Sequence, residues 1–299
     1  LRDRLGDCKD KCTLMIALLE AAGITDCDLA LVTPESDVNI AYLPSPRFEH
    51  VIVRRSLPDG TSHWYDPTVR FPDPDQVPRS LEGVPALVVR EGERSLSVIP
   101  KEDICEHPRR MSSRVVVVPN GDARIERKTA YSSIEQTSAL RVHLRSESEE
   151  DIEEELLTSL AMSCPGAELS TLDIRGVEEP DSAVVYDYAF DAPSLLAETG
   201  EIISGSLPAE SQLTEAFGAI VAKQERVSPI DLKKLGMCEH SETSVEYPDG
   251  FEVVAVPESK DLTFGDCLYS TRYETEGRTL KIRRTTVIDG YRVEPAQYP

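Results

Sequence analysis

The chain lacks any long hydrophobic run and has little positive charge. None of its apolar stretches approaches the roughly 20 residues that a membrane-spanning helix needs, so the sequence predicts no membrane span. Its 32 lysines and arginines stand against 54 aspartates and glutamates, which gives a formal net charge of −22 over 299 residues. Such an acidic chain repels nucleic acid and anionic membrane surfaces, and its few basic residues form no stripe for either. Nucleic acid is therefore excluded as an expected partner.

The sequence also lacks a phosphate-binding loop and a regular framework of disulfides. The sequence has no glycine-rich phosphate-binding loop, and no cofactor is predicted. Its cysteines show no regular disulfide spacing, and because there are seven of them, at least one thiol is unpaired within the chain. A free thiol is either inert core material or a nucleophile, and its surroundings decide which. The seven are Cys8, Cys12, Cys27, Cys105, Cys164, Cys238 and Cys267.

Hydrophobic patterning divides the chain into three regions. Residues 1–104 combine one strong helix with strands, residues 105–225 alternate like β-structure around one acidic helix, and residues 226–299 are β-like throughout. Turn signals predict several hairpins in the two later regions, which favours β-sandwich domains. One of them is expected around Pro248-Asp249-Gly250. The predicted fold class is therefore α+β, with a helix packed on an antiparallel sheet and β-sandwich domains after it.

The first helix is predicted at about Asp7–Ala22, with Asp7 as its N-cap and an apolar stripe that includes Leu14 and Leu18. Cys8 lies in the first turn of this helix, where the helix dipole and free backbone N–H groups favour a thiolate and lower the pKa of the thiol. Cys12 lies one turn later and gains less from the dipole. Cys8 is therefore the favoured nucleophile for attack on an acyl carbon.

A hairpin is predicted over residues 48–66, with a three-residue loop that pairs residues whose numbers sum to about 118. His50 then lies within two residues of Asp66 and on the same face of the sheet. A one-residue change of register would place the two on opposite faces. In the predicted register Asp66 can orient the His50 imidazole as the third member of a catalytic triad. Trp64 shares this face and is predicted to shield the pair from water.

Each of these residues also has a purely structural interpretation. An isolated Cys on a helix usually packs in a core, a lone His on a strand is usually a satisfied structural residue, and an Asp before Pro usually caps a turn. Two other patterns are rejected. Gly265-Asp266-Cys267 repeats the triplet around Cys8 but precedes a strand. Cys105-Glu106-His107 and Cys238-Glu239-His240 could together bind zinc, but their spacing is tight and the pairs lie far apart in the sequence, so no metal is predicted.

The residues around the three candidates resemble those of a known family. Gly6-Asp7-Cys8-Lys9-Asp10-Lys11, with the helix up to Gly23, closely resembles the Cys motif of bacterial transglutaminase-like proteins. Phe48-Glu49-His50-Val51-Ile52-Val53 is similar to their His strand, and Trp64-Tyr65-Asp66-Pro67-Thr68 to their Asp motif, in the same order. The later regions resemble, more weakly, the β domains of large exported members. The resemblance implies a papain-like core with a Cys–His–Asp triad, and export to the periplasm or cell surface.

The resemblance also implies that the chain is a fragment. It opens at Leu1 without a Met, shows no signal peptide, and has only seven residues before Cys8. In the family, helices upstream of the Cys complete the fold and supply an oxyanion donor, often Gln or Asn. We therefore expect residues 1–104 to be the C-terminal part of the catalytic core, with the Cys8 N–H as one available oxyanion donor. The chain as given is expected to fold, at least in its β domains, but to be weakly active or inactive without the upstream part.

The expected function is acyl transfer at an amide bond of a peptide or protein. Cys8 attacks, a thioester forms, His50 shuttles the proton and Asp66 orients His50. Hydrolysis, as in a peptidase or amidase, is favoured over cross-linking because water is always present and no amine site is identifiable. The alternative is an interaction or scaffold protein with a vestigial core and partner-binding β domains. Selective labelling of Cys8 by a thiol-directed electrophile would separate the two.

Overall fold

The computed structural model describes residues 6–34, 48–93, 95–208, 227–231, 236–290 and 292–297. The chain divides into two compact units, each of which is described by itself. The first unit contains Leu1–Asp103 together with Ile134–Val142 and Glu178–Ser182. The second contains the remaining segments, Ile104–Ser133, His143–Val177 and Ala183–Pro299.

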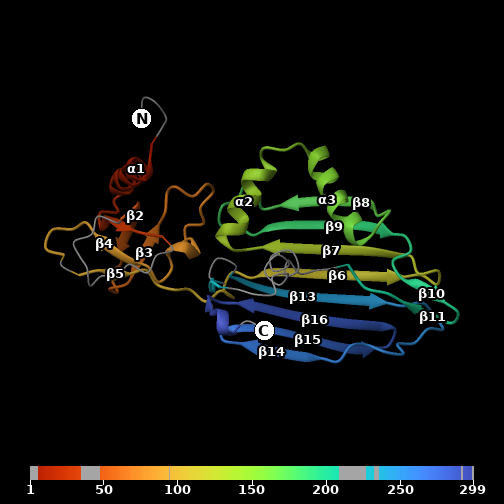
Figure 1. Cartoon of the computed structure of the whole chain (residues 1–299). Coiled ribbons are helices and arrows are strands. Elements are labelled where there is room, and N and C mark those ends of the chain that lie inside the picture. Colours follow the sequence, from red (N-terminus) through yellow and green to blue (C-terminus); the bar gives the residue numbers. More distant parts are fainter. Residues whose placement is uncertain are drawn as a thin grey trace. The chain divides into compact units, whose positions relative to one another are not determined.

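The strands of the first unit are drawn in red to orange in Figure 1. They form a five-stranded sheet with the order β3-β2-β1-β4-β5. All its neighbouring strands are antiparallel. Its strands are β1 (Cys27–Val32), β2 (His50–Ser56), β3 (Ser62–Tyr65), β4 (Pro85–Val88) and β5 (Ser97–Val98). In the β2–β3 hairpin Val53 pairs with Tyr65 and Arg54 with Trp64, which confirms the predicted register. The turn is closed by a 2.9 Å hydrogen bond from Leu57 N–H to the Thr61 carbonyl.

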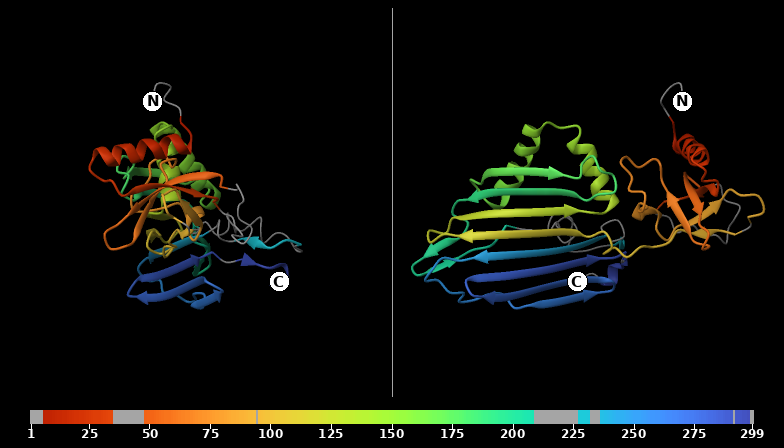
Figure 2. Two further views of the ribbon diagram at one scale, coloured as in Figure 1. Left: turned by 90° about the vertical axis from the view of Figure 1, so that its left-hand side faces the viewer. Right: turned by 180° about the vertical axis from the view of Figure 1, so that it is seen from behind.

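Helix α1 (Cys8–Ala21) lies across this sheet (Figure 2) and contacts β2 and β1. Its N-cap is Asp7, as predicted, and Asp7 and Asp10 form a reciprocal capping box. The predicted apolar stripe is wrong, because Leu14 and Leu18 are 39% and 63% exposed. The helix instead packs against the sheet through its sulfur-bearing face. This face and the partly or fully buried residues that pack with it are Cys8, Cys12, Met15, Ile16, Cys27, Leu29, Leu31, Val51, Val53 and Tyr65.

The opposite face of the sheet carries a separate core. Successive residues of a strand point to opposite faces, so Ile52 lies on the side away from Val51, Val53 and helix α1. Ile52 packs there with Trp64, which is buried. The other members of this cluster are Ala30, Val32, Val77, Leu81, Val84, Ala86, Val88 and Ile99.

Helix α2 (Ile134–Leu144), which the sequence patterning does not predict, joins the first unit through residues up to Val142. Its first N–H, from Ile134, donates to Gln76 Oε1 at 2.9 Å, and Glu135 accepts from the backbone of the short 3-10 helix η2 (Arg79–Leu81). The fully buried Arg141 donates to backbone carbonyls of the segment Glu178–Ser182. Polar contacts rather than an apolar stripe position this helix, which is why hydrophobic periodicity gives no sign of it.

The second unit is built on an eight-stranded sheet with the order β14-β15-β16-β13-β6-β7-β9-β8. Its neighbouring strands are antiparallel except for β6 and β13, which run parallel. The strands are β6 (Arg109–Val117), β7 (Ala123–Tyr131), β8 (Glu168–Arg175), β9 (Val184–Ala192), β13 (Met237–Glu246), β14 (Lys260–Phe264), β15 (Cys267–Glu276) and β16 (Thr279–Ile288). Two short pairs complete the strands, β10 (Ala197–Thr199) with β11 (Ile202–Ser204) and β12 (Ile230–Asp231) with β17 (Arg292–Val293), and a 3-10 helix, η4, spans Pro295–Gln297.

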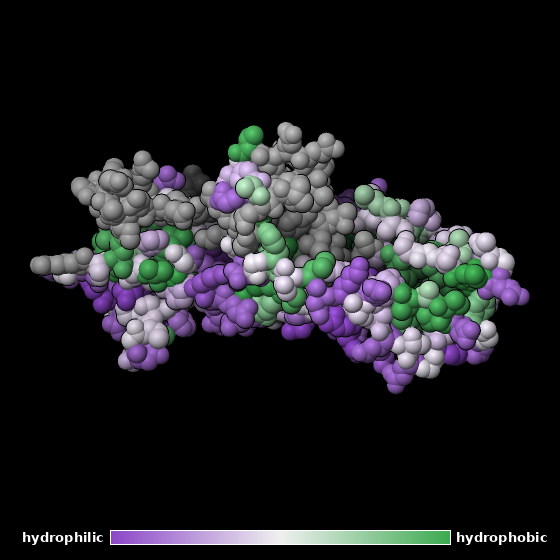
Figure 3. Space-filling model, turned by 60° about the horizontal axis from the view of Figure 1, so that its bottom comes forward, coloured by the Kyte–Doolittle hydropathy of each residue, from purple (hydrophilic) through white to green (hydrophobic). Residues whose placement is uncertain are grey.

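One face of this sheet is apolar and is packed against helix α3 (Glu149–Ser163). Leu160 of α3 lies in the same core as Ile125 of β7 and Phe190 of β9, and both strand residues are fully buried. Side chains alternate along β6 and β7 between this core and the solvent. Figure 3 shows that hydrophilic residues cover much of the face that it draws, with hydrophobic residues in separate areas.

The predicted fold class is wrong. Most of the regular structure in the described ranges is strand, helix is confined to three α-helices and short 3-10 turns, and no papain-like core of helices on a sheet is present among these residues. The expected β-sandwich is also absent from them, because residues from 105–225 and from 226–299 contribute to one sheet through the pairing of β6 with β13. The predicted hairpin around Pro248 does not form: β13 pairs with β16, and residues 251–259 contain no strand. Hairpin signals identify local pairs, whereas this architecture depends on pairing between distant segments.

None of the described helices is long and apolar enough to cross a membrane.

Replacing the core residue Phe190 with Ala should lower the free energy of unfolding of the second unit by about 3–5 kcal/mol, because it leaves a cavity in a filled core. Phe264, which is 47% exposed on β14, is the matched control. Phe264→Ala should cost less than about 1 kcal/mol. The measurement is urea unfolding of both variants, and equal losses would contradict the assigned core.

Candidate active site

His50 and Asp66 are hydrogen-bonded at one end of the β2–β3 hairpin. His50 is the first residue of β2 and Asp66 directly follows β3, and the His50 Nε2 to Asp66 Oδ2 distance is 2.8 Å. The side chains are 18% and 8% exposed, so water weakens this bond little. The hydrogen bond to Asp66 raises the pKa of His50 although burial opposes the shift. With Nε2 committed to Asp66, Nδ1 is the nitrogen that remains for a second partner.

Thr68 holds the other oxygen of the same carboxylate. Its backbone N–H and its hydroxyl donate to Asp66 Oδ1 at 2.9 Å and 2.6 Å. Burial is the largest influence on the pKa of Asp66 and raises it, but the hydrogen bonds from His50 and Thr68 together hold this pKa below its ordinary value. Asp66 is therefore an oriented carboxylate with a partner on each oxygen. Thr68 is not predicted as a site residue from the sequence, although Asp-Pro-Thr is a typical pattern for a turn in which Asp accepts from the residue two positions later.

Cys8 is the first residue of α1 and carries a free, partly exposed thiol. Burial raises the pKa of this thiol, but hydrogen bonds from the Val51 backbone and the His50 side chain outweigh burial and lower the pKa below its ordinary value. The charge of the N-cap Asp7 works against the thiolate. The structure thus brings Cys8, His50 and Asp66 together in the order Cys–His–Asp. A thiolate beside an oriented imidazole is the arrangement that nucleophilic catalysis requires.

Cys12 lies one helical turn after Cys8 and behaves in the opposite way. It is fully buried, and its thiol lies 3.2 Å from the Val51 carbonyl, to which it donates. Burial, followed by the charges of Asp66 and Cys8, raises the pKa of Cys12 to about 12. The peptide groups of Val51 therefore serve both thiols, with the N–H toward Cys8 and the carbonyl toward Cys12. Of the two, only Cys8 has the properties of a nucleophile.

Trp64 is placed in the core that Ile52 shares, on the sheet face away from α1. Its side chain is 7% exposed, and the Arg54 guanidinium lies over its ring at 5.9 Å from the centroid. Trp64 therefore packs as a core residue of the first unit. That Trp64 shields the His50–Asp66 pair stays a prediction.

No described set of potential metal ligands includes Cys8, His50 or Asp66.

The comparisons with known proteins are distant. The family described as a "Domain of Unknown Function with solved-structure structure (DUF3858)" matches residues 208–299. No curated protein matches the sequence. A solved structure described as a "putative protease" from Parabacteroides distasonis ATCC 8503 is similar over 99% of this chain, with 13% identity and a TM-score of 0.50. The chain spans 40% of the length of that protein. At this identity the likeness concerns the fold alone.

We expect thiol-directed labelling to distinguish Cys8 from the other cysteines by pH. Because the pKa of Cys8 is lowered and burial raises the pKa of Cys27, labelling of Cys8 should rise at lower pH than labelling of Cys27. His50→Ala removes a hydrogen bond that stabilises the thiolate, so it should move the Cys8 profile to higher pH. Iodoacetamide labelling at several pH values, followed by peptide mass spectrometry, measures both profiles. Coincident profiles for Cys8 and Cys27 would contradict an activated thiol.

We expect Thr68→Val to lower the free energy of unfolding of the first unit by about 1.5–3 kcal/mol at neutral pH, because it removes a hydrogen bond to a buried carboxylate. The pKa of Asp66 is depressed in the folded state, so this stabilisation is present above the ordinary pKa of Asp and is lost as pH falls through the folded pKa. Thr68→Ser should retain most of it.

Thr61 provides the matched control, because its hydroxyl donates to the exposed Asp59 at 2.6 Å in an equivalent turn. Thr61→Val should cost well under about 1 kcal/mol, since water replaces that bond. Urea unfolding at neutral and acidic pH measures the free energy of unfolding of the unsubstituted chain and of the variants Thr68→Val, Thr68→Ser and Thr61→Val. Equal losses for Thr61→Val and Thr68→Val would contradict a special role for the Asp66–Thr68 contact.

Proposed function

We propose that the chain catalyses acyl transfer at amide bonds of peptides or proteins, with Cys8 as nucleophile, in the manner of transglutaminase-like proteins. The observation that carries this proposal is the position of Cys8. Cys8 is the first residue of helix α1, and the pKa of its thiol is lowered. The thiol is hydrogen-bonded to His50, whose Nε2 lies 2.8 Å from Asp66 Oδ2. The resemblance of the three motifs to that family supports the same assignment.

In the proposed mechanism the Cys8 thiolate attacks the carbonyl carbon of the amide, and the carbonyl oxygen takes the negative charge. The protonated His50 gives its proton to the leaving nitrogen, the carbon–nitrogen bond breaks, and an amine leaves from a Cys8 thioester. Water then gives a proton to His50 and attacks the thioester, which releases a carboxylic acid and returns the Cys8 thiolate beside the protonated His50. Asp66 keeps the imidazole in the orientation and tautomer that both proton transfers require.

The backbone N–H of Cys8 is our candidate for one oxyanion donor. The first N–H groups of a helix have no partner within the helix, and here the Asp7 side chain accepts from the N–H groups of Lys9 and Asp10. The Cys8 N–H belongs to the nucleophile itself, so it lies close to the attacked carbonyl. The Val51 N–H is directed at the sulfur and stabilises the resting thiolate instead.

We propose hydrolysis rather than cross-linking as the outcome. Water requires no binding site of its own, and the similar solved structure is described as a "putative protease". Export to the periplasm or cell surface remains part of the proposal, and the Cys105–Cys238 disulfide is compatible with an oxidising compartment. The alternative scaffold function requires that Cys8 be dispensable.

The test is turnover of a chromogenic peptide amide and a peptide thioester by the full chain. Cys8→Ala should abolish turnover, and His50→Ala should lower kcat by about 10³-fold or more, as for other members of such triads. Cys27→Ala is the matched control, because Cys27 is also a free, partly buried cysteine near α1, and it should leave the rate unchanged. Parallel assays with an added primary amine distinguish hydrolysis from transamidation by product mass. Turnover that survives Cys8→Ala, or a chain that neither turns over nor forms a Cys8 adduct with a peptide aldehyde, would favour the scaffold.

A further inference from the structure

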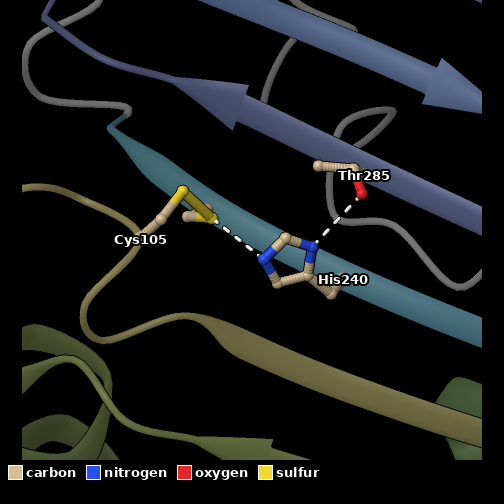
Figure 4. The surroundings of a disulfide bond; sticks show 4 residues. Cys105, His240 and Thr285 are labelled. Carbon is tan, nitrogen blue, oxygen red and sulfur yellow. Dashed lines mark hydrogen bonds between the residues drawn. A yellow bond between two sulfur atoms is a disulfide. The ribbon is translucent and has the colours of Figure 1, made fainter.

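The two Cys-x-His pairs, which lie far apart in the sequence, meet in the second unit. Cys105 precedes β6 by a few residues and Cys238 is the second residue of β13, and the parallel pairing of β6 with β13 brings them together. Their sulfur atoms form a disulfide across 133 residues of sequence (Figure 4). The long separation in the sequence made a shared site unexpected, but the pairing of β6 with β13 brings the two cysteines together in space.

His240 completes a three-residue cluster around this disulfide. It lies two residues after Cys238 on β13 and on the same face, and its Nε2 is 3.6 Å from Cys238 Sγ (Figure 4). Its Nδ1 is 3.2 Å from the hydroxyl oxygen of Thr285, which is its direct neighbour on β16. One donor atom from each of Cys105, Cys238 and His240 lies within 4.8 Å of the others.

We propose that Cys105, Cys238 and His240 form a redox-gated binding site for Zn²⁺ or a similar thiophilic divalent cation. In the oxidised chain the disulfide closes the site. A dithiol reductant opens it: two thiols of the reductant become a disulfide, and Cys105 and Cys238 become two thiols. Binding of one cation by these two thiols and His240 then releases two protons. The fourth position is left to water or an external ligand, as in zinc sites with three protein ligands.

The distances in the cluster fit this chemistry. Zinc bonds of about 2.3 Å to sulfur and 2.0–2.1 Å to nitrogen, arranged tetrahedrally, separate the two ligand atoms by about 3.6 Å. The Cys238 sulfur and the His240 nitrogen already have this separation. The two sulfur atoms must move apart, to about 3.8 Å, and breaking the disulfide removes the bond that prevents it.

Thr285 gives His240 the support that metal-binding histidines have. Such a histidine usually donates its second ring N–H to an oxygen, which fixes the tautomer and leaves the other nitrogen as the ligand. Here the Thr285 hydroxyl can accept from Nδ1–H, so that Nε2 presents its lone pair toward the sulfur atoms. Strands β13 and β16 are paired over ten residues, so the geometry of this contact is set by a regular ladder.

The test uses Co²⁺ alone as the probe, because its thiolate complexes are coloured. The assay uses the full chain with the substitution Cys8→Ala, so that the contact between Cys8 and His50 cannot contribute a second metal site. After reduction by a dithiol and removal of the reductant without air, one Co²⁺ per chain should bind with a thiolate charge-transfer band and tetrahedral absorption. Before reduction the band should be absent. Zn²⁺ should displace Co²⁺ and bleach the band.

Variants locate the site. Cys105→Ser and Cys238→Ser should each abolish the charge-transfer spectrum of the one-to-one complex, and Thr285→Val should weaken Co²⁺ binding about 10–100-fold. Cys267→Ser, in strand β15 of the same sheet, and Cys164→Ser, in the core, are matched controls that should leave binding unchanged. If a serine variant fails to fold, alkylation of Cys105 and Cys238 in the reduced native chain replaces it.

Absence of the band in reduced protein, or a band that persists without Cys105 and Cys238, would overturn the proposal. Because Cys8 is already replaced, either result leaves the proposed acyl-transfer function untouched.

Discussion

The register of the β2–β3 hairpin is the constraint on which the candidate site depends. Pairing of Arg54 with Trp64 places His50 and Asp66 at one end of the hairpin, where their side chains meet at 2.8 Å. Since successive residues of a strand point to opposite faces, a shift of one residue would separate the imidazole from the carboxylate. The short turn closed between Leu57 and Thr61 fixes this register, and Thr68 then fixes the carboxylate itself.

The same strand also places the thiol. Val51, next to His50, directs its N–H at Cys8 and accepts from Cys12 through its carbonyl, so β2 sets the depth and rotation of α1 as well as the position of the imidazole. Two cysteines one turn apart on the same helix consequently differ in character. The first is at the helix terminus beside His50 and has a lowered pKa, whereas the second is fully buried and has a pKa of about 12. The two residues are of the same type, so their positions along the helix decide that Cys8 is the candidate nucleophile and Cys12 a core residue.

In the second unit the parallel contact between β6 and β13 has a comparable role. It joins two antiparallel groups of strands into one eight-stranded sheet, and it brings Cys105 to Cys238 and His240. Without that contact the segments would form separate sheets, as the hairpin signals alone predict. A long-range pairing of this kind carries no local sequence pattern, because each strand alternates in the same way whatever neighbour it has.

The sequence by itself determined the local features: the N-cap at Asp7, the start of α1 at Cys8, the register of the β2–β3 hairpin, and the choice of Cys8, His50 and Asp66 as a group. These features depend on turns, caps and residues close in sequence, whose physical preferences are strong. Only the tertiary structure decided which face of α1 packs, that Trp64 belongs to the opposite core, that α2 is held by polar contacts, and that the later strands form one sheet. Those outcomes depend on which distant segments bury each other's surface, and periodicity along a single element does not specify its partner.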